Sequence, residues 1–396
     1  MGANQVQFRE FGGSGWKVSA LGFGCMRLPT LDGKPYSRKI DRDKASRMIR
    51  HSIDLGVNYI DTAYAYHGGM SEVLLGKILK DGYRERVKLA TKCPTWLIRK
   101  SKDFDTYLDE QLKRLQTDCI EFYLFHGING QTWKDVVKKY SLIKRAEAAI
   151  KDGRIGGIGF SFHDDFSAFK KIVDGYDDWC LCQIQYNYMD TENQAGTKGL
   201  KYAASKGLPV VVMEPLLGGK LANPPESIRA ILRDEGGGAS PADVALQWLW
   251  NQREVSVVLS GMSTMRQVNG NLRSADKSGV GSLRADKLEL VRHIKNRYLG
   301  MIPVPCTKCG YCMPCPHGVD IPKNFEVYNY GIIHCDLKDA RSSYSRFFDK
   351  KERASACKQC GECEKKCPQK IAIQKLMTEL QAVLGEGKRP STIRKS

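Results

Sequence analysis

The chain has 396 residues, of which 42% are hydrophobic and 27% charged. This length suffices for two or three domains with a large core, and the composition excludes a disordered or fibrous protein. Two quantities are unusual, a formal net charge of +18 and 14 cysteines. No stretch approaches the roughly 18 consecutive apolar residues of a membrane span, and residues 1–13 lack the apolar run of a signal peptide. We therefore expect a cytoplasmic protein whose cysteines are reduced and bind metal.

The first 300 residues alternate short apolar runs with longer amphipathic ones. The apolar runs are nearly continuous, which is typical of parallel strands buried on both faces. We expect strands at 18–26, 58–63, 87–93, 119–126, 155–162, 181–188, 208–213 and 255–260. We expect helices at 41–55, 71–80, 104–116, 132–151, 165–173, 195–206, 241–252, 264–273 and 284–297.

Eight such strand–helix units in about 300 residues predict a (β/α)8 TIM barrel. A doubly wound sheet also alternates strands and helices, but it would carry a dinucleotide fingerprint after its first strand. Here Gly22 and Gly24 lead into CMRLP rather than into a helix. The alternation therefore favours the barrel.

Polar side chains lie at the ends of three neighbouring predicted strands. Asp61 and Tyr66 belong to the second strand and the residues after it, Lys92 ends the third, and His126 ends the fourth. Singly, they have ordinary explanations as a turn cap, an aromatic contact, a solvent-facing cation and a core histidine. Because barrel active sites lie at the C-terminal ends of the strands, the four together predict a proton-donating site.

Eight of the nine cysteines between residues 306 and 367 form two runs. The runs are Cys306, Cys309, Cys312 and Cys315, and Cys357, Cys360, Cys363 and Cys367. Three cysteines with two-residue spacers, followed by Cys-Pro, are the bacterial ferredoxin pattern for a [4Fe–4S] cluster. The second run matches this pattern in full, and the first is one residue short before Cys315.

In two-cluster ferredoxins the fourth cysteine of each run binds the other cluster, which makes the short spacer tolerable. We expect one [4Fe–4S] cluster on Cys306, Cys309, Cys312 and Cys367, and another on Cys357, Cys360, Cys363 and Cys315. A pair of zinc sites is the alternative, because Cys-x2-Cys also suits tetrahedral zinc. The six other cysteines, including Cys335, are expected to pack as small core residues.

Longer motifs occur in a fixed order from about residue 6 to 275. They are REFGGSGWKVSALGFGCMRLP, NYIDTAYAYHGGMSE, LATK, YLFHG, IGFS, QIQYN and EPLLGGKL. In this order and spacing they resemble the aldo-keto reductase family. The continuation, with PCTKCGYCMPCP and the closing CPQ, is similar to members with a fused ferredoxin-like domain. We expect a barrel over 1–300, a small α-helical two-cluster domain over 301–385 and a basic tail over 386–396.

The resemblance implies that Asp61, Tyr66, Lys92 and His126 are a catalytic tetrad. The implied reaction transfers a hydride between a nicotinamide cofactor and a small carbonyl or alcohol substrate. Tyr66 would be the general acid, and the Lys92 ammonium would lower the pKa of Tyr66 because a nearby positive charge favours the phenolate. Asp61 would hold Lys92, and His126 would orient the carbonyl oxygen.

The resemblance also implies contacts with the cofactor. Ser161 and Gln183 would bind the nicotinamide amide, and the ribose, pyrophosphate and adenosine contacts would come from the barrel rim. These further contacts are Gly24, Cys25, Met26, Asp61, Met213, Leu216, Gly218, Lys220, Ser260, Gly261, Met262, Gln267 and Asn271. His163, directly after a strand, fits a substrate contact and a structural role equally, whereas His67 is expected on a loop surface.

Three positions depart from the commonest family pattern. Phe162 replaces an asparagine, Met213 replaces a tyrosine, and Gln267 stands where an arginine often binds a 2′-phosphate, with Arg266 adjacent. The last departure leaves NADPH and NADH both open, because a 2′-phosphate prefers a bidentate arginine. Together they leave room for weak nicotinamide binding or another cofactor on the same face.

The role of the clusters is open at this stage. A hydride carries two electrons, whereas a cluster passes one electron at a time, so a flavin would normally mediate between the nicotinamide and the clusters. No flavin motif is present in the sequence, although a barrel can bind a flavin without such a motif. One hypothesis is a carbonyl reductase or alcohol dehydrogenase whose clusters exchange electrons with a partner. The others are the same enzyme with structural clusters, and a non-catalytic electron-transfer or regulatory module. The complete tetrad argues against the last, and paired clusters favour the first.

The positive charge remains after cluster loading, because two clusters of about −2 each would leave roughly +14. No nucleic-acid-binding motif accompanies it. It favours electrostatic docking of an acidic ferredoxin or flavodoxin. Between the cysteine runs, residues 317–356 predict one or two helices.

Overall fold

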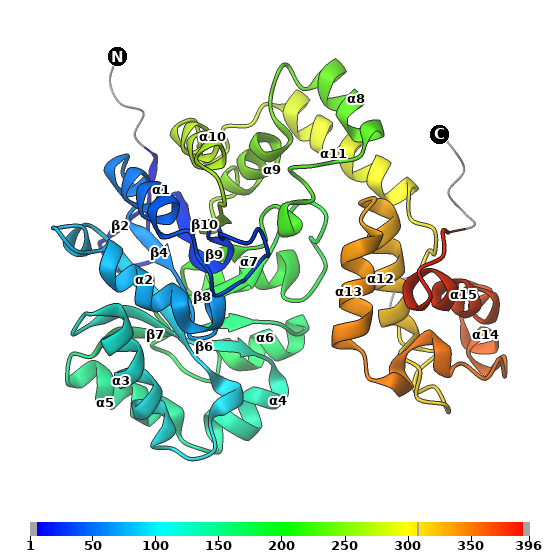
Figure 1. The fold of residues 1–396 in the computed structure, drawn as a ribbon, viewed down its shortest axis with the longest axis horizontal. Coiled ribbons are helices and arrows are strands. Elements are labelled where there is room, and N and C mark those ends of the chain that lie inside the picture. Colours follow the sequence, from blue (N-terminus) through cyan, green and yellow to red (C-terminus); the bar gives the residue numbers. More distant parts are fainter. Residues whose placement is uncertain (1–5, 307–308, 391–396) are drawn as a thin grey trace. The chain divides into compact units, whose positions relative to one another are not determined.

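The computed structural model describes residues 6–306 and 309–390, so part of the expected basic tail lies outside it (Figure 1). The described residues form two compact units. The first contains the residues up to 222 together with 239–291, and the second contains 223–238 together with the residues from 292 onward. The division passes through one helix, Ala285–Gly300, between residues 291 and 292.

The first unit is a closed barrel of eight parallel strands within the described residues, which confirms the predicted fold class. The strands are β3 (Leu21–Gly24), β4 (Tyr59–Asp61), β5 (Lys88–Cys93), β6 (Ile120–Ile128), β7 (Ile155–Phe162), β8 (Leu181–Gln185), β9 (Val210–Met213) and β10 (Val255–Gly261). Each pairs with its neighbour in chain order, and β10 closes the barrel by pairing with β3. The continuous apolar runs are therefore buried on both faces, by the barrel interior and by the outer helices.

Helices surround the strands on the outside of the barrel (Figure 1). They are α1 (Arg42–Asp54), α2 (Met70–Ile78), α3 (Asp103–Leu115), α4 (Gly130–Thr132), α5 (Leu142–Lys151), α6 (Phe166–Val173), α7 (Gly196–Ser205), α9 (Pro241–Trp250) and α10 (Met265–Asp276). Their starts carry side-chain caps where the sequence offers them: Asp41 before α1, Ser240 before α9 and Thr264 before α10. These caps bind backbone N–H groups that the first helical turn leaves without partners.

Three segments differ from the expected elements. The strand expected at 18–26 is two strands, because Lys17–Ser19 (β2) pairs antiparallel with Phe8–Glu10 (β1) before the barrel strand begins. The helix expected at 132–151 is interrupted by a π-helical turn and by Ser141, whose φ is 53°. Helix α8 (Glu226–Glu235) was not expected, because prolines and three glycines flank it.

Aromatic side chains fill the barrel near the starts of its strands. Phe11 and Trp16, from the β1–β2 hairpin, pack against Phe122, with ring centroids 5.1 and 5.9 Å away. Tyr59, the first residue of β4, stacks on Phe122 at 5.6 Å. This end of the barrel is filled by side chains, so the opposite end, where the strands finish, is the one available for a site.

The second unit is helical and has its own core. Its elements are α8, the C-terminal part of α11 (Ala285–Gly300), α12 (Ile321–Ile333), α13 (Leu337–Phe347), α14 (Glu362–Lys366) and α15 (Ile373–Leu380). The buried core includes Phe325, Tyr328, Tyr344, Met377 and Leu380. Helices α12 and α13 are those predicted between the cysteine runs. None of the described helices in either unit combines the length and apolar character of a membrane span.

The close approach of α2 and α3 generates a stability prediction. A Cβ on Gly76 of α2 would lie 2.6 Å from the carbonyl oxygen of Arg114. Replacing glycine by alanine normally stabilises a helix by about 0.5–1 kcal/mol, but here the backbone of α3 is in the way. We expect Gly76→Ala to destabilise the barrel by about 1–3 kcal/mol, measured by urea unfolding.

Gly270 in α10 provides the matched control, because nothing lies within 4 Å of its Cβ position. Gly270→Ala is expected to raise the unfolding midpoint by the ordinary helix-propensity effect. Midpoints that move in the same direction in both variants would contradict this packing of α2 on α3.

Candidate functional site

A buried ion pair lies at the centre of the barrel's C-terminal end. The Nζ of Lys92, in β5, lies 2.8 and 2.9 Å from the two carboxylate oxygens of Asp61, the last residue of β4. It also donates to the carbonyl oxygen of Thr62 at 2.7 Å. Lys92 and Asp61 are only 1% and 3% exposed. The parallel pairing of β4 with β5 brings these two strand ends side by side.

Tyr66 and His126 complete the predicted tetrad. The Tyr66 hydroxyl lies 3.4 Å from the Lys92 Nζ, and the rings of Tyr66 and His126 meet edge to face at 6.1 Å. Tyr66 begins a 3-10 turn in which His67 and Gly68 adopt positive φ values of 52° and 60°. Trp96, which was not expected from the sequence, also packs against His126, with ring centroids 5.1 Å apart.

The protonation of these groups follows from burial as well as from charge. Burial raises the pKa of Tyr66, and the Lys92 ammonium opposes this only in part, so the pKa of Tyr66 lies above its ordinary value. The expectation that Lys92 would give Tyr66 a lowered pKa is therefore wrong, because desolvation of the phenolate outweighs the ammonium. Burial, with the Lys92 charge, lowers the pKa of His126 to about 3, which keeps this imidazole neutral near pH 7.

Ser161, near the end of β7, pairs in register with Gln183 in the neighbouring strand β8. The Gln183 amide nitrogen donates to Asp61 at 3.2 Å, while its carbonyl oxygen is buried and has no hydrogen-bond partner among the described residues. The Ser161 hydroxyl accepts a bond from the Gly127 N–H at 2.7 Å. A buried acceptor without a partner fits the amide N–H2 of a nicotinamide, so these residues suit that group.

The other expected cofactor residues lie along the C-terminal ends of three strands. Gly24 ends β3, Cys25 and Met26 follow it, and Gly261 pairs in register with Gly24. Met213 ends β9, and the turn after it contains Leu216, Gly218 and Lys220. In that turn the Glu214 carboxylate accepts a bond from the Gly218 N–H, a contact that the sequence analysis missed.

Gln267 and Asn271 have intramolecular partners. The Gln267 side-chain oxygen accepts bonds from the N–H groups of Ser263 and Thr264, and the Thr264 hydroxyl in turn accepts from the Gln267 N–H. This reciprocal capping box begins α10, so Gln267 acts as a helix cap. Asn271 donates to the Ser260 hydroxyl at 2.8 Å.

Glu72 and Gln111 form a buried polar network behind the tetrad. The Glu72 carboxylate, fully buried, accepts bonds from Thr91, Gln111 and Arg114. Gln111 also donates to the backbone carbonyl of Lys92 at 3.2 Å. The network therefore holds the β5 backbone on which Lys92 stands. The signal for it in the sequence was a glutamine on the apolar face of α3, among Phe104, Leu108 and Leu115.

Expectations for two further histidines, His67 and His163, can be compared with their positions in the structure. His67 is 1% exposed and its Nδ1 lies 2.7 Å from the Ser37 carbonyl oxygen, so the expected surface position is wrong. The short turn that carries Tyr66 folds His67 inward against the segment after β3. His163 lies just beyond β7 and is exposed.

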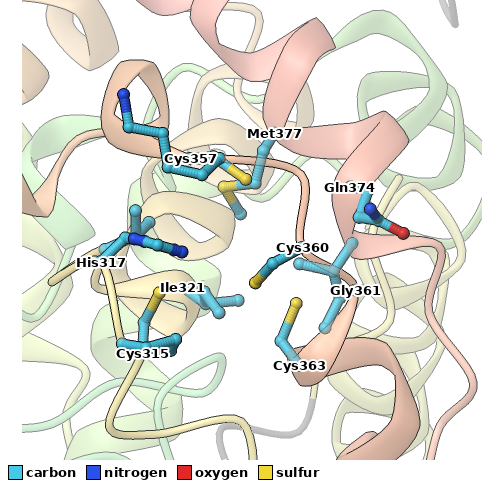
Figure 2. Close-up of a pocket in the computed structure, with 13 residues that line it drawn as sticks. Cys315, His317, Ile321, Cys357, Cys360, Gly361, Cys363, Gln374 and Met377 are labelled. Atoms are coloured by element: carbon cyan, nitrogen blue, oxygen red, sulfur yellow. The ribbon is translucent and has the colours of Figure 1, made fainter.

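The cysteine runs meet in the second unit around two cavities of the described residues. Cys315 lines one cavity with three cysteines of the second run, Cys357, Cys360 and Cys363, and Figure 2 shows these side chains around a common space. The other cavity is lined by Cys306, Cys309, Cys312 and Cys367. Each cavity thus combines three thiols of one run with the last thiol of the other, and four thiolates are the ligand set of a [4Fe–4S] cluster.

The thiols surround these cavities rather than meeting at a point. Within residues 6–306 and 309–390, no group of three or more His, Cys, Asp or Glu side chains is placed to hold a metal ion. The other cysteines divide: Cys25, Cys93 and Cys182 are buried as expected, and Cys119 and Cys180 are partly exposed. The expectation of a core position is wrong for Cys335, which is exposed in a left-handed turn after α12.

Family comparison agrees with this arrangement. The model of the aldo/keto reductase family matches residues 20–280. The chain belongs to this family. A 4Fe-4S dicluster domain matches residues 305–373 of this aldo/keto reductase, which confirms the fused architecture expected from the sequence. An oxidoreductase with an iron–sulfur domain follows from the two matches.

Three similar proteins each cover about 70% of this chain. L-galactose dehydrogenase of Arabidopsis thaliana is 29% identical over 289 residues, covering 68% of this chain and 88% of that protein. The uncharacterized oxidoreductase YrpG of Bacillus subtilis is 26% identical over 314 residues, covering 69% and 92%. Among solved structures, the holo form of aldo-keto reductase AKR11C1 from Bacillus halodurans superposes with a TM-score of 0.60 at 25% identity, covering 73% and 96%.

The crossed arrangement of the thiols generates a prediction. Although Cys315 follows Cys312 closely in sequence, it shares its cavity with Cys360. We expect Cys315→Ser to lose about half of the bound iron and to give the same electron paramagnetic resonance spectrum as Cys360→Ser.

Cys309→Ser should instead remove the signal of the other cavity, and Cys335→Ser is the control that keeps both. A Cys315→Ser spectrum that matches Cys309→Ser would show that each run binds its own cluster.

Proposed function

We propose that this aldo/keto reductase interconverts a small carbonyl compound and the corresponding alcohol with a nicotinamide cofactor. We further propose that two [4Fe–4S] clusters, one in each cysteine-lined cavity, exchange electrons with a partner protein. The observation that carries the first proposal is the Tyr66 hydroxyl 3.4 Å from the buried Lys92 ammonium and next to His126. The name of the similar plant enzyme, L-galactose dehydrogenase, is consistent with oxidation of an alcohol.

Tyr66 is the proposed proton donor in the reductive direction. Its raised pKa keeps the hydroxyl protonated at neutral pH, so the proton is present when a carbonyl oxygen becomes an alkoxide. In the oxidative direction the Tyr66 phenolate accepts the proton back. The Lys92 ammonium stabilises this phenolate, which forms after proton transfer in the reductive direction and is present before it in the oxidative direction. The Asp61 carboxylate and the Thr62 carbonyl accept hydrogen bonds from the ammonium. Burial lowers the pKa of Lys92, but Asp61 and Tyr66 outweigh this effect, so the pKa of Lys92 is raised.

His126 is the proposed orienting residue for the carbonyl oxygen. Its low pKa keeps the ring neutral, so it donates one hydrogen bond without supplying a second acidic proton. Trp96 and Tyr66 both contact the ring. A single proton source and a separate hydrogen-bond donor are sufficient for the proton transfer that accompanies carbonyl reduction.

Gln183 and Ser161 are the proposed contacts of the nicotinamide amide. When bound, the nicotinamide supplies or accepts the hydride. The unpartnered Gln183 carbonyl oxygen would accept from the amide N–H2 and the Ser161 hydroxyl would donate to the amide oxygen. Because Gln183 also donates to Asp61, binding of the amide would be linked to the Lys92–Asp61 pair. NADPH and NADH both fit this end of the site.

A structural role of the clusters is the second candidate function. It is favoured by the packing of Cys306, Cys312, Cys315, Cys357, Cys363 and Cys367 against the core of the second unit. Electron exchange is favoured by Cys309 and Cys360, which are exposed and would bring each cluster close to solvent. Electron transfer needs such an exposed edge, whereas a structural cluster does not.

Exposed lysines support an acidic partner such as a ferredoxin or flavodoxin. Lys358, Lys366 and Lys370 lie in the segment of the second cysteine run, and none makes an ion pair among the described residues. Lys365, between them, pairs with Glu362 at 2.8 Å. Unpaired ammonium groups of one sign beside an exposed thiol attract a negatively charged surface.

The assignment of Tyr66 generates the test of the reductase function. We expect Tyr66→Phe to lower kcat for carbonyl reduction about 10²–10⁴-fold, because the proton donor is lost. Cofactor affinity, measured by calorimetry, should stay within about twofold, since the phenyl ring keeps its packing.

Tyr64→Phe is the matched control, because the Tyr64 hydroxyl bonds Glu110 rather than a tetrad residue. It should retain turnover. Undiminished carbonyl reduction by Tyr66→Phe would overturn the assignment.

The lysine segment generates the test of electron exchange. We expect reduction of the clusters by a reduced acidic ferredoxin to slow steeply as salt rises from 50 to 500 mM, since ionic steering is screened. Replacing Lys358, Lys366 and Lys370 by glutamine should slow it at low salt by about tenfold.

The matched control is the glutamine replacement of three exposed lysines of the barrel unit, Lys134, Lys138 and Lys139. It should leave the rate within about twofold. Clusters that no ferredoxin reduces at any salt concentration would favour the structural role.

A further inference from the structure

Gln359 lies inside the second cysteine run, between Cys357 and Cys360, and the proposed function gives it no role. Its backbone has a φ of 55°, in the left-handed region that residues other than glycine rarely adopt. Such a conformation persists only where the surrounding contacts enforce it, and it is concentrated at functional sites. The contacts of the Gln359 side chain therefore indicate what this conformation achieves.

The side-chain amide of Gln359 is held by helix α15. Its Nε2 donates to the carbonyl oxygen of Gln374 at 3.1 Å and to the hydroxyl of Thr378 at 3.3 Å. In return, the side-chain amide of Gln374 donates to the carbonyl oxygen of Gln359. Because a backbone carbonyl oxygen can only accept, the contact with Gln374 fixes the Gln359 amide with its nitrogen, and not its oxygen, toward the helix.

The same nitrogen contacts one of the expected cluster ligands. The Gln359 Nε2 donates to the Sγ of Cys357 at 3.6 Å. Cys357 is one of the four cysteines that line the cavity of the second run, and Figure 2 shows it at the wall of that cavity together with Gln374. The amide is therefore held between α15 and a sulfur atom that would bind the cluster.

A hydrogen bond to a ligand sulfur affects the reduction potential of an iron–sulfur cluster. The reduced cluster carries one more negative charge than the oxidised cluster, and part of this charge resides on the sulfurs. An N–H donor therefore stabilises the reduced form more strongly and raises the reduction potential. In the reduction, one electron enters the cluster and the donor, an acidic ferredoxin or flavodoxin in the proposed function, is oxidised by one electron.

The sequence of the first cysteine run differs at the position that corresponds to Gln359. The residue directly before the second cysteine of that run is Lys308, which carries no amide group in its side chain. Cys357 lines the cavity of the second run and not the other cavity. A change at Gln359 should therefore affect one cluster and leave the other as an internal reference.

We propose that Gln359 tunes the cluster of the second-run cavity by donating its amide N–H to the Cys357 sulfur, which raises the reduction potential of that cluster. Gln374 and Thr378 are positioning residues for this amide. The proposal rests on the proposed function, because it requires a [4Fe–4S] cluster in this cavity. It deepens that function by assigning a residue that determines how readily the cluster accepts an electron from its partner.

The experiment is a redox titration of the full-length protein with dithionite, followed by electron paramagnetic resonance. The spectra of Cys309→Ser and Cys360→Ser assign the signals of the two clusters. We expect Gln359→Leu to lower the equilibrium constant for reduction of the second-run cluster about tenfold, which corresponds to about 59 mV for one electron. Gln359→Glu should lower it further, because a carboxylate of the same size cannot donate and adds a negative charge. The signal of the other cluster should keep its potential.

Thr378→Val is the matched control, because it removes one acceptor of the same amide and leaves the donor to Cys357 in place. It should leave both potentials unchanged. A shift in Thr378→Val as large as that in Gln359→Leu would show that anchoring of the loop sets the potential, and would overturn the proposal. Loss of this cluster's iron in both Gln359 variants would also overturn it, since the side chain would then hold the cluster rather than tune it.

Chemical reduction depends neither on a partner protein nor on turnover, so this proposal and the proposed function fail separately. Unchanged potentials in Gln359→Leu and Gln359→Glu, with reduction by ferredoxin intact, remove the tuning role alone. A lowered potential in these variants of a protein that no ferredoxin reduces removes the electron exchange alone.

Discussion

The buried Lys92–Asp61 ion pair is the interaction on which the rest of the site depends. Lys92 and Asp61, which are 1% and 3% exposed, are each other's charged partner in the barrel interior. Removing one partner of such a pair typically costs about 3–5 kcal/mol, since the other charge is left in a low-dielectric interior. The pair exists because a closed parallel barrel places the ends of β4 and β5 side by side. Tyr66, Gln183 and the Glu72–Gln111 network are arranged around it.

Most of the barrel could be predicted from the sequence, and so could the composition of the tetrad. Strands buried on both faces leave continuous apolar runs, and a polar residue at the end of such a run is conspicuous. The protonation of Tyr66 could not be predicted. Spacing shows that Lys92 is near, but the pKa depends on how deeply the phenol is buried, which only the tertiary structure determines. The buried position of His67 likewise depends on the tertiary structure.

The arrangement of the cysteines, too, could be predicted only in part from the sequence. The spacing of the cysteines indicated that they bind clusters, and the short first run indicated that the last cysteine of each run binds the cluster of the other run. Which cavity Cys315 lines is seen only in the folded chain. Gln267 was predicted as a cofactor contact because the family often has an arginine at this position, although Thr264-x-x-Gln267 is also the local signature of a capping box.

Helix α8 has a consequence for how the two units can be separated. It belongs to the cluster unit, although its neighbours in the chain on both sides belong to the barrel. His293 and Glu235 pair at 2.9 Å, which ties α8 to the last turns of α11. The polypeptide therefore passes between the units three times, and no single peptide bond divides them. Separating the iron–sulfur unit from the barrel therefore requires cuts after residues 222, 238 and 291, and a fragment starting at residue 301 would lack helix α8, which belongs to this unit.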